Sequence, residues 1–230
     1  MQLVKLIKTA SPEANFLALL SISTLAFKIF FLNSIPQIFP GAHQFGLIFE
    51  AILASVVASY IFYIIVVHIK EQEDKSTINP YISKHTKYII DNCSAQLRAI
   101  SNISEINLEL ESLNKDSLLT ALSKIPPYSD APLMLASTNK SAHWLQYLNY
   151  NMNHAKSSIR RILDQLPFLD AKLVALITAI DDCSLYMHIE FAQTIKINNE
   201  SLANFGEAFY EYFTFCKSLK FYAQTLPGTN

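Results

Sequence analysis

Two long apolar stretches near the N-terminus constrain this chain more than any other feature of its sequence. Residues 15–32 carry one charge, Lys28, and residues 45–67 carry one charge, Glu50. A helix over residues 12–32 is about 31 Å long and matches a hydrocarbon core of about 30 Å. We therefore predict a hairpin of two transmembrane helices, at about 12–32 and 45–67, within a membrane domain of residues 1–70.

Two other interpretations of these stretches stay open. Lys5 and Lys8 resemble the basic start of a signal peptide, although no small-x-small cleavage site precedes the next apolar run. The second alternative is a hairpin buried inside a soluble protein. The length of the apolar stretch at residues 45–67 argues against it.

Basic residues predict the orientation of the hairpin. Lys5 and Lys8 precede the first span, Lys70 and Lys75 follow the second, and the loop of residues 33–44 has no Lys or Arg. Because Lys and Arg are enriched in cytoplasmic loops, both termini are expected in the cytoplasm. In a bacterium, this pattern describes a multi-pass inner-membrane protein whose short loop lies outside.

The two charges within the apolar spans need a partner or a route to water. Each costs about 2.5–3.5 kcal/mol at the bilayer centre and less near an interface. In an antiparallel hairpin, Lys28 and Glu50 both fall about 6–8 Å below the outer surface. We expect them to pair, within one hairpin or between neighbouring subunits. The alternative is that Lys28 extends outward and that Glu50 is protonated or meets water.

Small residues recur along the second span at four-residue steps. They form one stripe on the face of Glu50 (Gly46, Ala54 and Ala58) and a neighbouring stripe (Ala51, Ser55 and Ser59). Small side chains let helix backbones approach closely in lipid, so these stripes predict an oligomerisation face. Packing against the first span of the same chain is the alternative.

Residues 71–230 are predicted to form a cytoplasmic antiparallel helical bundle. No glycine lies between Gly46 and Gly206, which removes the usual residue of tight β-turns and favours helices throughout. Asn79–Pro80 are expected to be the N-cap and first residue of a helix that ends near residue 102. A short helix is expected over residues 115–125, before a proline-rich break.

Apolar residues at alternating three- and four-residue steps predict three further helices. The first stripe is Leu145, Leu148, Met152, Ala155, Ile159, Ile162 and Leu166; the second, in a helix beginning near Asp170, is Leu173, Leu176, Ile180, Cys183 and Met187; the third is Leu202, Phe205, Phe209, Tyr212, Cys216 and Leu219. The predicted fold class is therefore all-α.

The sequence contains no recognisable catalytic motif. It lacks GxSxG, P-loop, GxGxxG and HExxH patterns. Asp181 and Asp182 point about 100° apart on a helix, so one is expected to be exposed and one to lie at the bundle edge. Cys93, Cys183 and Cys216 have no CxxC spacing and suit reduced thiols. We expect no enzyme activity, catalytic residue, metal, cofactor or small-molecule substrate.

One basic cluster stands out in a chain that is nearly neutral, with 18 Lys and Arg against 19 Asp and Glu. It consists of Lys156, Arg160 and Arg161, of which Lys156 and Arg160 share a helix face. This patch could contact nucleic acid, a protein or anionic lipid. A solvated helix face is the alternative, since three charges make a small patch.

The membrane region resembles a known group of bacterial proteins. The residues PQIFPGA at 36–42 and ASYIFYIIVV at 58–67 are similar to small proteins with two membrane spans and a helical cytoplasmic tail. The group includes membrane effectors encoded beside retron reverse transcriptases, which act in antiphage abortive infection. The resemblance covers about residues 12–70. It implies an effector held silent by a reverse transcriptase with its DNA–RNA product, and it carries no catalytic residues.

Three functions are consistent with these features. The first is a toxic antiviral effector whose hairpins form homo-oligomers in the lipid bilayer and perturb it after release from the partner. The second is a passive membrane anchor whose bundle recruits a cytosolic complex. The third is a two-span ion channel, for which the short loop offers little pore structure.

Overall fold

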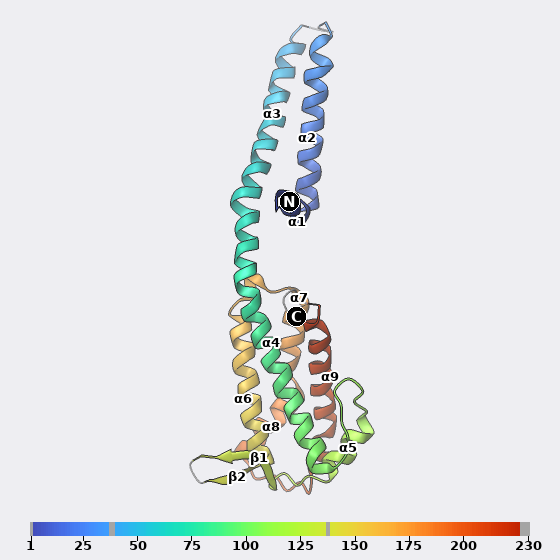
Figure 1. The fold of residues 1–230 in the computed structure, drawn as a ribbon, viewed down its shortest axis with the longest axis vertical. Helices are drawn as coiled ribbons and strands as arrows, with labels where there is room; N and C mark the ends of the chain where they lie inside the picture. Colours follow the sequence, from blue (N-terminus) through green and yellow to red (C-terminus); the bar gives the residue numbers. More distant parts are fainter. Residues whose placement is uncertain (1, 37–39, 137–138, 226–230) are drawn as a thin grey trace. The chain divides into compact units, whose positions relative to one another are not determined.

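The computed structural model describes residues 2–36, 40–136 and 139–225 (Figure 1). The described residues are mainly helical, which confirms the all-α prediction at this level. The chain divides into two compact units, Met1–Thr77 and Ile78–Asn230, and the division falls inside the long helix α4 (Ile69–Ser104). Each unit is described by itself below.

The first unit is a helical hairpin with a short helix before it. Its elements are α1 (Gln2–Thr9), α2 (Pro12–Phe30), a 3-10 turn (Leu32–Ser34), α3 (Ala42–Phe62), a π-helical segment (Tyr63–His68) and the start of α4. The Ser11 side chain accepts a hydrogen bond from the Ala14 N–H, 3.3 Å away, and Pro12 occupies the first turn. Both features fix the start of α2.

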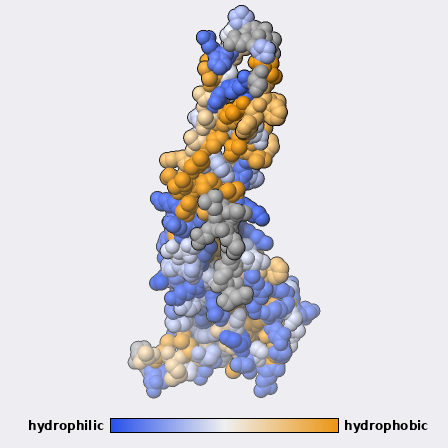
Figure 2. Space-filling model, turned by 45° about the horizontal axis from the view of Figure 1, so that its top comes forward, coloured by the Kyte–Doolittle hydropathy of each residue, from blue (hydrophilic) through white to orange (hydrophobic). Residues whose placement is uncertain are grey.

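Two helices are long and apolar enough to cross a membrane: α2 and the helix that begins at Ala42. The first ends two residues before the predicted limit, and the second continues through the π-helical segment into α4. No residue of α3 is buried, and in α2 only Ala18, Ser21 and Lys28 are. Figure 2 shows hydrophobic side chains gathered over this hairpin.

The second unit is a helical bundle with a small hairpin of strands. With α4 from Ile78 onward, it contains α5 (Lys115–Ser123), β1 (Asp130–Leu135), β2 (Lys140–His143), α6 (Trp144–Leu163), α7 (Ala171–Asp181), α8 (Ser184–Thr194), α9 (Gly206–Ala223) and 3-10 turns at Leu166–Phe168 and Leu202–Phe205. The aromatic residues Trp144, Phe209, Tyr212 and Phe213 are fully buried in its core. The face of this unit that Figure 2 shows is largely hydrophilic.

The prediction of helices throughout was wrong at residues 130–135 and 140–143. There β1 and β2 form an antiparallel pair, with Asp130 opposite His143 and Leu135 opposite Lys140. Asn139 has a φ of 53°, and its N–H donates to the Leu135 carbonyl over 2.8 Å. Asparagine tolerates this left-handed conformation better than most residues, so the turn does not depend on glycine.

The second of the three predicted bundle helices was wrong as a single element. α7 does begin after Asp170, but it ends at Asp181, and α8 begins at Ser184. The Glu211 carboxylate accepts hydrogen bonds from the backbone N–H and the hydroxyl of Ser184, and so holds the start of α8. The break shifts the helical phase, and Met187, expected in the apolar stripe, is 60% exposed.

Two further expectations were wrong at helix ends. Asn79–Pro80 do not begin a helix, because α4 runs continuously from Ile69 and includes Pro80. Pro80 has no N–H, so one backbone hydrogen bond of the helix is not formed. In the preceding turn, the hydroxyls of Ser76 and Thr77 both donate to the Glu73 carbonyl. The last residue of the first bundle stripe, Leu166, lies beyond the end of α6 and is exposed.

Candidate functional site

The contact between α2 and α3 is built on small side chains of α2. Ala18 and Ser21 are 3% and 4% exposed, which makes them among the few buried residues of the hairpin. Small residues allow the two backbones to approach closely. The sequence analysis identified small residues on the second span and missed this pair, although their three-residue spacing was a visible signal.

Lys28 and Glu50 form an ion pair within one hairpin. Lys28 is buried, at 8% exposure, and Glu50 is half-buried. Gly46 makes room for the lysine, since a Cβ at this position would lie 3.3 Å from Lys28 Cε. Each of the two charges therefore has its partner in the same chain, and no second subunit is needed to pair them.

A cavity of about 280 Å³ adjoins this ion pair at the loop end of the hairpin. Its polar lining comes from Lys28, Asn33 and His43, and Gly46 forms part of its wall. The cavity has room for water beside the lysine ammonium group. This arrangement gives Lys28 a polar surrounding in addition to the Glu50 carboxylate.

Polar contacts also join the elements at the other end of the hairpin. The Tyr60 hydroxyl donates to Asn15 Oδ1, and Asn15 Nδ2 donates to the Ile7 carbonyl over 2.8 Å. Thr9 Oγ1 lies 3.0 Å from Nε2 of His68, which is 3% exposed. The sequence analysis missed these contacts, because they join single polar residues that follow no motif.

The small-residue stripes of α3 divide between two environments. Gly46 faces Lys28 of α2. Five residues of the stripes remain exposed: Ala51, Ala54, Ser55, Ala58 and Ser59. Ser55 follows Gly46 by nine residues, so it projects from α3 about 180° away from the contact with α2. The stripe of Ala51, Ser55 and Ser59 therefore faces away from α2 and is exposed among the described residues of the hairpin.

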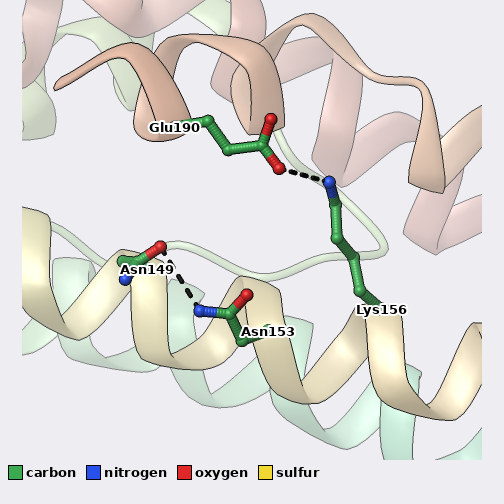
Figure 3. A network of polar contacts seen from close by, with 4 residues as sticks. All are labelled: Asn149, Asn153, Lys156 and Glu190. Carbon is green, nitrogen blue, oxygen red and sulfur yellow. Dashed lines mark hydrogen bonds and ion pairs between the residues drawn. The ribbon is translucent and has the colours of Figure 1, made fainter. Parts of the chain in front are cut away.

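The basic cluster of α6 is partly neutralised. Lys156 Nζ lies 2.5 Å from Glu190 Oε1 of α8 (Figure 3). Arg160 and Arg161 are exposed and form no ion pair with another described residue. Of the three predicted contact residues, the two arginines are therefore the ones available to an external anion.

The acidic pair at the end of α7 has the predicted asymmetry. Asp181 is half-buried and Asp182 is exposed. Burial raises the pKa of Asp181 above its ordinary value, while Lys156 opposes this shift and Asp182 adds to it. Among the described residues, no three His, Cys, Asp or Glu side chains gather as a metal-binding group.

The three cysteines lie in the core of the bundle, as expected for Cys183 and Cys216. Cys93, Cys183 and Cys216 are all buried free thiols. Burial raises the pKa of Cys183 to about 12 and also raises the pKa of Cys93. Both groups are therefore protonated at neutral pH, and a protonated buried thiol is a poor nucleophile.

Fold and side-chain arrangement together define a mainly helical protein with two candidate membrane spans and an ion pair between them. No protein-family model, curated protein or solved structure matches this chain.

Proposed function

We propose that this protein is an effector in which α2 and α3 cross a bacterial inner membrane as a hairpin, associate with hairpins of other copies and perturb the bilayer. The observation that carries the proposal is an apolar hairpin that is exposed on nearly all sides, while the two charges of its apolar stretches, Lys28 and Glu50, are paired with each other. Such a surface is suited to lipid and poorly suited to water.

The exposure of large side chains argues against the two alternative interpretations of the hairpin. Phe30 of α2 is 74% exposed and Phe45 of α3 is 70% exposed, whereas a hairpin buried in a soluble protein covers such residues. A cleaved signal peptide needs no packing partner, yet α2 is joined to α3 by the Lys28–Glu50 and Asn15–Tyr60 contacts.

The exposed stripe of Ala51, Ser55 and Ser59 supports association between hairpins. Lipid tails give no hydrophobic drive for helix association, so close backbone packing and interhelical hydrogen bonds supply it. This stripe offers small side chains for close packing and two hydroxyls as donors or acceptors. The Lys28–Glu50 pair is already formed within one chain, and it leaves this stripe as the oligomerisation face.

The biological setting rests on the resemblance of residues 12–70 to two-span effectors. In this setting the protein belongs to a retron-type antiphage system. A reverse transcriptase with its DNA–RNA product holds it silent, and infection releases it to cause abortive infection. Both chain termini lie in the cytoplasm, on the side of Lys5, Lys8 and Lys70.

Expression without partner genes tests the proposal. We expect induction of the full chain in bacterial cells to depolarise the inner membrane, as a potential-sensitive dye reports, and to stop growth. The double variant Ala51→Leu and Ser55→Leu blocks close packing while keeping the span apolar, so depolarisation should fall at least several-fold. Ile61→Leu, at an already bulky exposed position of α3, is the matched control and should behave as the wild type.

Normal membrane potential and growth at full expression, with the protein recovered in the membrane, would contradict the effector function. So would full activity after replacement of residues 12–67 by an unrelated two-span hairpin. The second result would assign the protein to the class of passive anchors, for which the spans need only be apolar.

A further inference from the structure

A cavity in the helical unit lies between α4 and α6. It has a volume of about 490 Å³, within the range of small-molecule sites. His85, Tyr88 and Asp91 of α4 line one wall, and His154, Ser157 and Arg161 of α6 line the other. The cavity thus collects hydrogen-bonding, cationic and aromatic groups from two helices.

His85 forms a buried part of the cavity wall, at 5% exposure. Its Nδ1 has no hydrogen-bond partner among the described residues, as is also true of Thr86 Oγ1, Trp144 Nε1 and Tyr186 OH, and it is enclosed too tightly for a ligand atom to reach it. Burial, followed by the charges of Arg161 and Lys84, lowers the pKa of His85, and the neutral ring can donate or accept.

The walls of the cavity are fixed by hydrogen bonds at one end. Asn92 Nδ2 lies 3.2 Å from both the backbone oxygen and Oδ1 of Asn151, which joins α4 to α6. Gln96 Nε2 in turn donates to Asn92 Oδ1 over 2.6 Å. A site held in this way needs little ordering when a ligand binds, and this favours affinity.

Arg161 gives the site a preference for anions. Its side chain is exposed at the cavity and forms no ion pair with another described residue. An adjoining hollow of about 250 Å³ shares Ser157 and Arg161 with the cavity and adds Arg160. The Arg161 guanidinium and the Ser157 hydroxyl, one turn apart on α6, suit the oxygens of a phosphate, because arginine forms paired hydrogen bonds with them.

Aromatic rings give the other half of the site a preference for a planar group. Tyr88 is 51% exposed on α4, and His154 is exposed on α6, so each helix presents one ring at the cavity. Stacking on aromatic rings is a common way to hold nucleobases.

We propose that the cavity between α4 and α6 binds a phosphorylated nucleoside, with its base between Tyr88 and His154 and its phosphate on Arg161. The His85 ring forms part of the wall beside this ligand. The sequence analysis expected no small-molecule substrate, and this ligand is bound without being converted. The site lies within residues 78–225 and does not depend on the proposed membrane activity.

Calorimetric titration of the purified full chain in detergent tests this site. The probes are AMP, GMP, CMP and UMP, together with adenosine and inorganic phosphate. We expect at least one nucleotide to bind with a Kd of about 100 μM or tighter, and more tightly than adenosine or phosphate alone. Arg161→Ala should weaken this binding at least tenfold. Arg98→Ala removes an exposed arginine of α4 outside the cavity and is the matched control.

Tyr88→Ala is a second variant, and it should weaken nucleotide binding while its thermal unfolding midpoint shows that the bundle still folds. The proposal is overturned if no nucleotide binds at about 1 mM. It is also overturned if Arg161→Ala binds as tightly as the wild type, or if phosphate binds as tightly as every nucleotide. The last result would leave a simple anion site with no role for Tyr88 and His154.

Discussion

At the scale of single residues, Lys28 and Glu50 carry the charge of the two apolar stretches. An isolated charge within an apolar span costs up to about 3 kcal/mol, and an opposite charge in contact lowers the cost for both partners. The structure joins them within one chain, and Gly46 leaves the space that the lysine side chain occupies. Their value to the protein therefore lies in mutual compensation, which a paired substitution can test.

We predict that Lys28→Met destabilises the hairpin by about 2–3 kcal/mol, because it leaves the Glu50 carboxylate without its partner in an apolar span. The double variant Lys28→Met and Glu50→Leu removes both charges and should recover most of this loss. Thermal unfolding of purified protein in detergent, followed by circular dichroism, measures the difference. If Lys28→Met were as stable as the wild type, the Glu50 carboxylate would have to be stabilised by something other than Lys28.

At the scale of elements, hydrophobic periodicity predicted the buried face of α6 correctly. The stripe from Leu145 to Ile162 lies in the core, as its spacing predicted. Periodicity did not reveal the break at Asp182–Cys183, because apolar residues at helical spacing occur both before it (Ile177 and Ile180) and after it (Leu185 and Ile189). The break depends on Glu211, which is distant in sequence, and no local pattern reports such a contact.

The candidate sites show the same limit. The Lys28–Glu50 pair could be predicted, since two lone charges in apolar runs are visible in the sequence and helical rise sets their depth. The cavity between α4 and α6 could not be predicted, because His85 and Arg161 are far apart in sequence and neither belongs to a motif. A site of this kind depends on how two helices pack.

Asp170 tests how one residue stabilises a helix. Its carboxylate accepts a hydrogen bond from the Leu173 N–H over 2.9 Å at the start of α7, and another from the Tyr222 hydroxyl of α9. We predict that Asp170→Ala lowers the free energy of unfolding by about 1 kcal/mol, as loss of an N-cap typically does. Asp170→Asn keeps an N-cap acceptor and should lose less. Denaturant unfolding measures both.

The same residue makes stability depend on pH. Burial alone pushes the pKa of Asp170 upward, but the hydrogen bonds from Tyr222 and the backbone outweigh it, so the pKa lies below its ordinary value of 3.8. A lowered carboxyl pKa contributes stability above pH 3.8, and this contribution is lost as the pH falls through the folded-state pKa. Asp170→Asn should therefore lose less stability than the wild type on acidification below pH 4. An unchanged acid transition would contradict this role.

At the scale of the whole molecule, the distribution of hydrophobic surface separates the two units. In the first unit α3 has no buried residue, whereas the second unit has an extensive core around Trp144, Phe209 and Phe213. A hairpin without a core of its own gains its stability from a surrounding apolar phase. A bundle with a full core gains it from internal packing. The two units are thus suited to different solvents.

This difference leads to a prediction about topology. Because the loop at residues 33–44 lacks Lys and Arg and both flanks of the hairpin carry them, the two chain ends should share the cytoplasmic side. Alkaline phosphatase fused after Asn230 should be inactive in cells, and the same reporter inserted in the loop should be active. The protein should stay in the membrane fraction after alkaline carbonate extraction.

Exchanging the flanking charges provides the control for this prediction. Replacing Lys5 and Lys8 with glutamine and placing two lysines in the loop removes the asymmetry of positive charge while leaving both apolar spans unchanged. Since Lys and Arg near the span ends set orientation, this variant should insert in the opposite sense in part of the molecules, and the Asn230 fusion should gain activity. An active fusion in the wild-type chain would mean that the charges do not orient this hairpin.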